Sequence, residues 1–391
     1  MGDDEKKLLK NLGLLAGGAA IGYKFGKMLQ ESEDYHRKNP LLDFKAMLDS
    51  VEVQLVRAAI SGNIPQIQVL LSEGVDINTK SAGEAILIWA GRSGQKTVVE
   101  FLLNRGADVN TREEVSDSTV LMKMSGQGRK DIVEVLLTHG ANINAKDRND
   151  WTALMYAIKN NQENIVELLS TYGADTNVKD KEGWTPLIIA VIKRNRAIVQ
   201  ALLNNGADVN TQMQIDLMKE IGEDITNPNT LIERGMECLG DRGLKDKLHS
   251  MLMDTGGNIG KTQCTTIMGI NALMAAIILG HVAIVRDLLD MGATTRIENV
   301  CNHDIVLFAI GEGNLPIIRE LLDKGIDVDI KGERGQKALL TAVLKDDPAI
   351  VKILIDRGVN LNEKDEKGNT ILTIAEEFSR KKTANILRKF F

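Results

Sequence analysis

The feature that most constrains this chain is a unit of about 33 residues that recurs through most of its length. Each copy has one aligned position in a first apolar stripe, and nearly every copy has a glycine 16 residues later. The stripe positions are Ala58, Ala90, Met124, Ala157, Ala190, Ala276, Ala309, Ala342 and Ala375. The glycines are Gly74, Gly106, Gly140, Gly173, Gly206, Gly292, Gly325 and Gly358. A fixed period of this size predicts a solenoid, in which each unit packs on its neighbours.

The stretch 179–210 shows what one unit contains. Thr185 is a favourable helix N-cap, and Pro186 follows at the first helical position, where its missing N–H costs nothing. Two apolar stripes at helical spacing are separated by a polar break at Arg194 and Asn195, and Gly206 suits the end of the second helix. Helices this short are marginal alone in water, so the unit needs neighbours to bury its apolar faces.

These units resemble the ankyrin repeat family. The matching segments are 185–187 (TPL), 106–110 and 206–210 (both GADVN), 140–144 (GANIN) and 284–288 (IVRDL). The resemblance covers about residues 52–391, and it implies an all-α solenoid of about nine to ten helix-turn-helix repeats. It also implies a concave face, built from loop tips and first helices, that binds other proteins.

One departure from the family pattern is consistent. Where the family has the histidine of its T-P-L-H tetrapeptide, this chain has Met122, Met155, Ile188, Met274 and Leu340. We therefore expect apolar packing at these positions in place of histidine hydrogen bonds.

The period is interrupted after the fifth copy, where 86 residues separate Ala190 from Ala276. Residues 235–268 are interpreted as a degraded repeat, because apolar residues and Gly256-Gly257-Asn258-Ile259 fall near the expected places. The rest of the excess is assigned to an insertion near 212–229. The predicted domains are therefore an N-terminal segment, residues 1–39, and a solenoid, residues 40–391. Within the solenoid, residues 40–50 are expected to form an extra helix that caps the first repeat.

The N-terminal segment is rich in glycine and lies outside the repeat pattern. Gly18, Gly22 and Gly26 recur at every fourth residue, a spacing that lets helices approach closely in a membrane or an oligomer. The uncharged run is shorter than the roughly 20 apolar residues of a spanning helix. Two interpretations stay open: a weakly helical tail, or membrane or partner contact through residues 8–29.

Composition and motifs argue against several function classes. The formal net charge is −6, so bulk attraction to nucleic acid is not expected. Three cysteines without C-x-x-C spacing favour a reducing compartment, and we expect a cytoplasmic protein with possible peripheral membrane association. Five scattered histidines assemble no catalytic arrangement, so we expect no enzyme activity and no cofactor.

Two motifs fall short of known ligand sites. Residues 255–262 (TGGNIGKT) differ from the phosphate-binding loop at its first glycine, and a helical pattern precedes them where a strand is needed. Cys264, Cys301 and His303 lack an evident fourth zinc ligand, so we predict no metal site.

The candidate binding residues lie at loop tips and first-helix ends of repeats two to five. Trp151 and Trp184 precede the capping threonines of consecutive repeats, a position that is variable and exposed in the ankyrin family. They are interpreted as an exposed ladder of two indoles that contacts a partner, or alternatively as shields for their own loops. The neighbouring positions are Arg92, Arg148, Asn149, Lys159, Asn160, Lys181, Glu182 and Lys193.

Five of these eight neighbours are cationic although the whole chain is acidic. The hypothesis is a non-catalytic scaffold or adaptor whose groove takes a partner segment with acidic and apolar residues. The first alternative is a membrane-tethered scaffold held by the N-terminal segment. The second is a nucleotide-dependent switch at 255–262.

Overall fold

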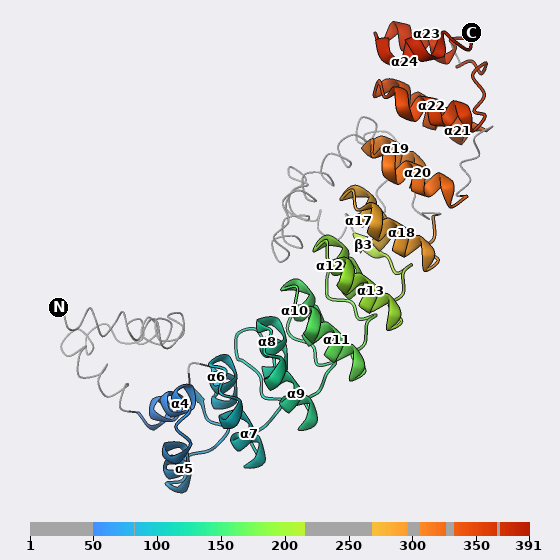
Figure 1. The fold of residues 1–391 in the computed structure, drawn as a ribbon. Coiled ribbons are helices and arrows are strands. Elements are labelled where there is room, and N and C mark those ends of the chain that lie inside the picture. Colours follow the sequence, from blue (N-terminus) through green and yellow to red (C-terminus); the bar gives the residue numbers. More distant parts are fainter. Residues whose placement is uncertain (1–49, 82, 216–267, 296–304, 326–331, 366–367) are drawn as a thin grey trace, which may run out of the picture. The chain divides into compact units, whose positions relative to one another are not determined.

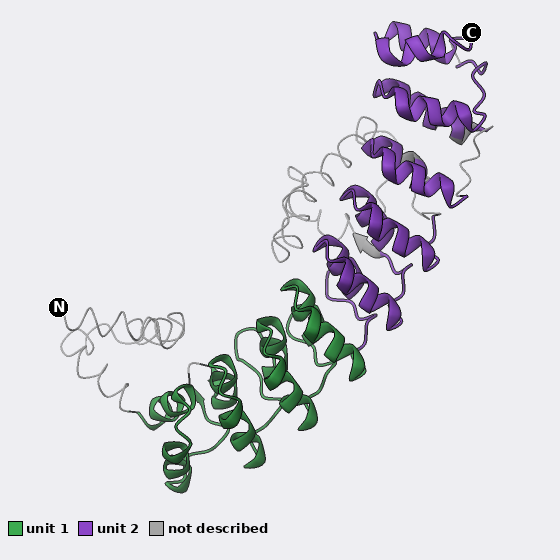
Figure 2. Ribbon diagram, viewed as in Figure 1, with its two compact units in different colours: residues 1–174 green, residues 175–391 purple. Residues whose placement is uncertain are grey.

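The computed structural model describes residues 50–81, 83–215, 268–295, 305–325, 332–365 and 368–391. The chain divides into two compact units, of which the first ends at Ala174 and the second begins at Asp175 (Figure 2). Helices make up nearly all of the regular structure in the described residues, which confirms the predicted all-α fold class.

Unit 1 is a two-layered stack of short helices (Figure 1). Its helices are α4 (Val51–Ser61), α5 (Ile64–Ser72), α6 (Ile86–Arg92), α7 (Lys96–Asn104), α8 (Val120–Gln127), α9 (Lys130–Thr138), α10 (Ala153–Lys159) and α11 (Glu163–Thr171). The first helices α4, α6, α8 and α10 pack side by side in one layer, and α7, α9 and α11 pack in the other. A short antiparallel pair, β1 (Lys80–Ser81) and β2 (Glu84–Ala85), precedes α6.

Unit 2 repeats this arrangement. Its helices are α12 (Pro186–Ile192), α13 (Arg196–Asn204), α17 (Ala272–Ile278), α18 (Val282–Asp290), α19 (Ile305–Glu312), α20 (Leu315–Asp323), α21 (Glu333–Leu344), α22 (Pro348–Asp356), α23 (Ile371–Glu377) and α24 (Lys381–Leu387). The first helices α12, α17, α19, α21 and α23 pack in sequence order. The strands β3 (Met213–Ile215) and β4 (Met268–Ile270) pair antiparallel beside them.

The helix boundaries follow the signals read from the sequence. The Thr185 side chain accepts a hydrogen bond from the Ile188 N–H at 3.3 Å, and Thr119, Thr152 and Asn271 cap their helices in the same way. Gly206 has φ of 81°, the left-handed conformation expected after the second helix. The predicted capping is confirmed at Thr152, Thr185 and Gly206.

Apolar side chains take the place of the family histidine. Met122, Met155, Ile188 and Met274 are all buried, each in the first turn of its first helix. Leu340 is half-buried. The expected apolar packing is therefore confirmed at the four fully buried positions.

Asparagine side chains bind successive repeats together at the end of the Gly-Ala-Asp-Val-Asn segments 106–110 and 206–210 and of the related segment 173–177 (GADTN). In unit 1, the Asn110 Oδ1 accepts the backbone N–H of Asn142 at 2.8 Å. In unit 2, Asn177 accepts the N–H of Asp208 at 2.7 Å, and Asn210 accepts the N–H of Thr294 at 2.7 Å. Each bond satisfies a loop N–H in the next repeat, so the motif links neighbours as well as ending a helix.

The Asn210 bond joins two repeats that are separated by the insertion in sequence. Here α12 packs directly on α17 and α13 on α18. Arg196 makes a bidentate ion pair with Asp287, with Nε–Oδ2 and Nη2–Oδ1 distances of 2.6 and 2.8 Å. These hydrogen bonds lower the pKa of Asp287. The stack is therefore continuous across the insertion.

The degraded repeat expected at 235–268 stays a prediction. The described residues on either side of it show that α13 and α18 contact each other. The β3–β4 ladder pairs Ile215 with Met268 at the base of the insertion. The internal structure of 235–268 and of most of the 212–229 insertion lies outside the described residues.

Other expectations also fall outside the described residues. They concern the N-terminal segment with its proposed contact residues 8–29, nearly all of the capping helix at 40–50, the phosphate-loop resemblance at 255–262, and Cys264, Cys301 and His303.

We predict that residues 216–267 can be removed without unfolding unit 2. Because Ile215 and Met268 are a strand pair, an Asn-Gly dipeptide joining them should form a two-residue hairpin turn. Circular dichroism should show that the shortened chain keeps its helices and a cooperative thermal transition. Loss of that transition would contradict the continuous stack.

The Arg196→Ala variant provides a control in both the shortened and the full-length chain. It removes the Arg196–Asp287 pair, so it should lower the unfolding midpoint by a similar amount in each. If Arg196→Ala lowered the unfolding midpoint of only the shortened or only the full-length chain, the α13–α18 contact would differ between these two proteins.

Candidate partner-binding surface

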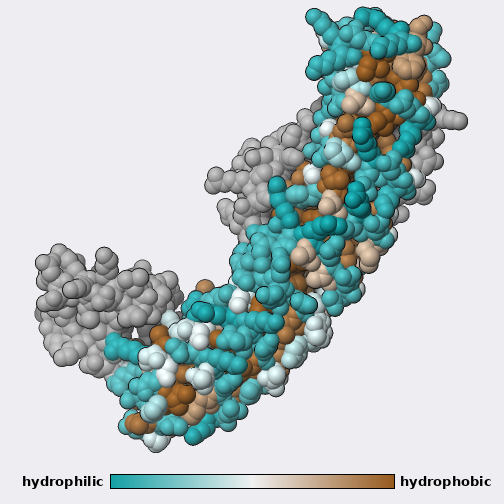
Figure 3. Space-filling model, in the orientation of Figure 1, coloured by the Kyte–Doolittle hydropathy of each residue, from teal (hydrophilic) through white to brown (hydrophobic). Residues whose placement is uncertain are grey.

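The eight polar residues predicted to bind a partner lie at the surface, but in two separate units. Unit 1 holds Arg92 and Lys159 at the ends of α6 and α10, the α10 C-cap Asn160, and the loop residues Arg148 and Asn149. Unit 2 holds Lys181 and Glu182 before α12, and Lys193 at its C-cap. Six of the eight are exposed, and Lys159 and Lys193 are half-buried. Hydrophilic residues cover much of the face seen in Figure 3.

The two tryptophans are not exposed, contrary to the predicted ladder. The side chains of Trp151 and Trp184 are both only 5% exposed. In two other repeats of unit 1, the residue directly before the helix N-cap is also buried. These residues are Glu84 and Ser118, each 3% exposed. This position therefore faces inward in these repeats. Because the tryptophans belong to separate units, stacking between them remains a prediction.

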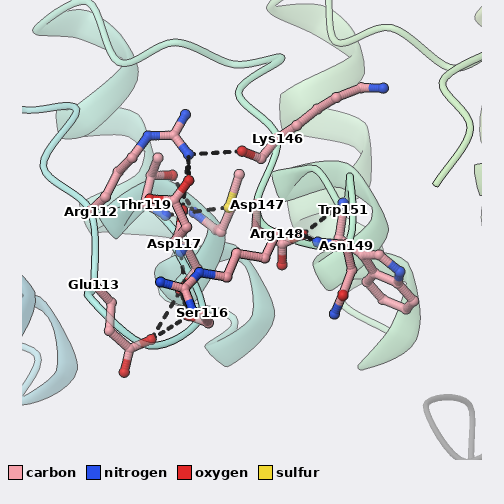
Figure 4. Close-up of polar contacts among 12 residues, drawn as sticks. Arg112, Glu113, Ser116, Asp117, Thr119, Lys146, Asp147, Arg148, Asn149 and Trp151 are labelled. Atoms are coloured by element: carbon pink, nitrogen blue, oxygen red, sulfur yellow. Dashed lines mark hydrogen bonds and ion pairs between the residues drawn. The ribbon is translucent and has the colours of Figure 1, made fainter. Parts of the chain in front are cut away.

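An aspartate in each loop explains why the tryptophan turns inward. The Asp147 Oδ1 accepts the backbone N–H groups of Asn149 and Trp151 at 2.8 and 2.9 Å, and the Asp147 N–H donates to the Trp151 carbonyl (Figure 4). In unit 2 Asp180 makes the same bonds to Glu182 and Trp184. Each loop closes tightly on its aspartate, and the Trp151 ring lies against Tyr156 and Lys159 of the helix that follows.

The Trp151 indole lies just before α10 and contacts two side chains of that helix, Tyr156 and Lys159. Its ring meets that of Tyr156 edge-on, with centroids 5.5 Å apart. The Lys159 ammonium lies 5.3 Å from the indole centroid, a cation–π contact. The Tyr156 hydroxyl donates to Asp147 Oδ2 at 2.8 Å. Trp151 thus packs within its own repeat and positions Lys159, which fits the alternative that it shields its loop.

An ion-pair cluster in unit 1 was not predicted from the sequence. The buried Glu84 carboxylate pairs with Arg92 at 2.6 Å and with Lys123 at 3.3 Å, and Lys123 also pairs with Glu113 at 2.8 Å. The cluster links the loop before α6 to α8 and to the loop that precedes α8. Arg92, one of the predicted partner contacts, is therefore already neutralised within the chain.

A signal for this cluster was present in the alignment of repeats. The position one residue before the aligned stripe residue holds Trp89 and Tyr156 in neighbouring repeats, but Lys123 in α8. A lysine at the position where its two neighbouring repeats place large aromatic side chains indicates a partly buried cation that needs an anion. Its side chain is 16% exposed.

The two carboxylates of the cluster have opposite pKa shifts. Burial raises the pKa of Glu84, and its neighbours Arg92 and Lys123 only partly offset that effect. Burial acts on Glu113 in the same direction, but hydrogen bonds from Lys123 and Ser116 prevail and lower its pKa to about 2. Glu113 is thus the more strongly stabilised anion of the pair.

The comparisons with known proteins agree with the repeat pattern. A family model described as ankyrin repeats, in three copies, matches residues 50–113, 121–213, 241–332 and 306–389. A comparison with curated protein sequences finds no match. Among the described residues, no helix has both the length and the apolar character needed to cross a membrane.

We predict that Trp151→Ala destabilises unit 1. Removal of a buried tryptophan typically costs about 3–5 kcal/mol, because it leaves a cavity beside Tyr156 and Lys159. Urea denaturation of the full-length chain should show this loss. The control Tyr172→Ala removes an aromatic ring that is 47% exposed in the same unit, and it should change stability by no more than about 0.5 kcal/mol.

We also predict that Lys123→Met destabilises the fold at pH 7 by roughly 3 kcal/mol, because it leaves two partly buried carboxylates without their shared cation. A lowered pKa means that Glu113 contributes stability above about pH 4.5, which is lost as the pH falls toward 2. In the variant, the Glu113 titration followed by carboxyl NMR should move up toward its ordinary value.

Lys146→Met is the matched control for this prediction. Lys146 pairs with Asp150 at 3.9 Å, and both side chains are more than two-fifths exposed. Its loss should cost less than about 1 kcal/mol. Equal costs for the two variants would contradict the importance assigned to the cluster.

Proposed function

The chain belongs to the ankyrin repeat family, and we propose that it is a non-catalytic scaffold or adaptor that binds a partner protein on its loop tips and first-helix ends. Ankyrin repeats are generally protein–protein interaction modules. The observation that carries the proposal is a polar surface over a tightly packed loop and helix in unit 1, formed by the exposed Arg148, Asn149 and Asn160 and the half-buried Lys159.

The cations of this surface favour a partner segment with acidic residues. The Arg148 guanidinium and the Lys159 ammonium are held at fixed places, the first by the Glu114 carbonyl and the second over the Trp151 ring. A fixed cation loses less side-chain entropy when it meets a carboxylate. In unit 2, Lys181, Glu182 and Lys193 occupy corresponding places in their own repeat and form a second candidate surface.

The tryptophans have an indirect role in this proposal. Trp151 and Trp184 support the surface from below, and the polar side chains above them meet the partner. Three cysteines without metal-ligand spacing are in keeping with a cytoplasmic location.

A pair of double variants tests the proposal. Arg148→Gln with Lys159→Gln removes two cations from the proposed surface, whereas Lys96→Gln with Lys130→Gln removes two from the second helices α7 and α9. Partners captured by the full-length protein from an extract of its own cells can be quantified by mass spectrometry. We expect the first variant to reduce capture about tenfold or more, and the second to leave it nearly unchanged.

Equal capture by both variants would disprove the proposed surface. Circular dichroism of each variant should first show that its helix content and melting temperature match those of the unmodified chain.

A further inference from the structure

The loop of residues 112–119, here called the long loop, differs from its neighbours in unit 1. The repeat that contains it is 34 residues long where most are 33, so the loop has one additional residue. Arg112 and Thr119 pair across its base. Val115 lies in the turn and is 69% exposed, the highest value among the large hydrophobic residues in the described part of the chain.

Hydrogen bonds hold the long loop from both sides. The Glu114 N–H donates to the Gly83 carbonyl of the preceding loop at 3.1 Å. From the following loop, the Arg148 N–H donates to the Ser116 carbonyl at 3.2 Å, and its Nη2 donates to the Glu114 carbonyl at 2.6 Å. Figure 4 shows the Arg148 side chain reaching across to the long loop. The Val115 backbone is therefore preorganised, which lowers the entropy cost of binding.

The base of the long loop is fixed by a second arginine. Arg112 Nη1 donates to the Lys146 carbonyl at 2.8 Å and pairs with the Asp117 carboxylate at 2.8 Å (Figure 4). Because these contacts use backbone carbonyls and side chains away from Val115, a substitution at Val115 breaks none of them.

Charged groups of opposite sign flank Val115. On one side, the Glu114 carboxylate lies beside Gly83, with its Oε2 3.2 Å from the position that a Cβ would take on Gly83. On the other side lies the Arg148 guanidinium, which keeps further N–H donors beyond the one it gives to Glu114. The long loop and the loop that follows it thus present an anion (Glu114), an apolar side chain (Val115) and a cation (Arg148).

We propose that this apex anchors a partner peptide in which an apolar side chain lies between a basic and an acidic residue. The apolar side chain covers Val115, the basic residue pairs with Glu114, and the acidic residue pairs with Arg148. This inference rests on the proposed function, because Arg148 belongs to the same surface. It adds Val115 and Glu114 as the residues that determine specificity.

A random peptide library displayed on phage, selected against the immobilised full-length protein, tests the proposal. Selected peptides are synthesised, and their affinities are measured by fluorescence polarisation. Val115→Asp should weaken binding at least about tenfold, because an apolar contact is replaced by a charge. Val115→Ser serves as a second, milder variant. Val69→Asp, at a 49% exposed valine on α5 of the same unit, should leave affinity unchanged.

Charge variants separate this inference from the proposed function. Selection against Glu114→Gln should lose the preference for basic residues, and selection against Arg148→Gln should lose the preference for acidic ones. One outcome would overturn the anchor at Val115 and leave the proposed surface intact. In it, the selected peptides bind the Val115→Asp variant with unchanged affinity but do not bind the double variant Arg148→Gln with Lys159→Gln. If the unmodified protein selects no peptide, the anchor is overturned, whereas the proposed surface is judged by the capture experiment with the two double variants.

Discussion

Burial of each helix pair against its neighbours is the constraint on which the rest of this structure depends. Two of the first helices are buried on all sides: every residue of α12, from Pro186 to Ile192, and of α17, from Ala272 to Ile278, is buried. Such a helix has no stable existence in water by itself, because its few backbone hydrogen bonds do not offset the entropy of ordering it. Loops are then free to vary as long as neighbouring pairs remain in contact.

The insertion shows how far that freedom extends. Between α13 and α18 the chain departs after Ile215 and returns at Met268, yet Asn210 bonds Thr294 and Arg196 bonds Asp287 as if the two repeats were consecutive. The strand pair β3–β4 brings the two ends of the insertion together at the solenoid. The number of residues in the insertion therefore does not change how the neighbouring helix pairs pack. A long excursion from a loop costs little conformational free energy compared with a lost interface between repeats.

The periodicity of the sequence predicted in which part of a repeat most residues lie, but it did not predict how deeply their side chains are buried. The small residues, the caps and the left-handed glycines follow from local spacing, because they are set within one repeat. The burial of Trp151 depends on where Asp147 directs the loop, and the pairing of Glu84 with Lys123 joins residues of different repeats. The spacing of residues in the sequence predicts neither the burial of Trp151 nor the pairing of Glu84 with Lys123. Lys123, at the position where the two neighbouring repeats have Trp89 and Tyr156, was the one local sign of the ionic cluster.

These contacts also decide which charges of unit 1 can act on a partner. Arg92 and Lys123 are bound by Glu84 and Glu113, so their fields largely cancel within the chain. Arg148 is anchored through a neutral carbonyl and Lys159 through the face of an indole, and neither contact supplies an opposing charge. A chain with a net charge of −6 can therefore present a locally cationic surface, because internal carboxylates neutralise some cations and leave others.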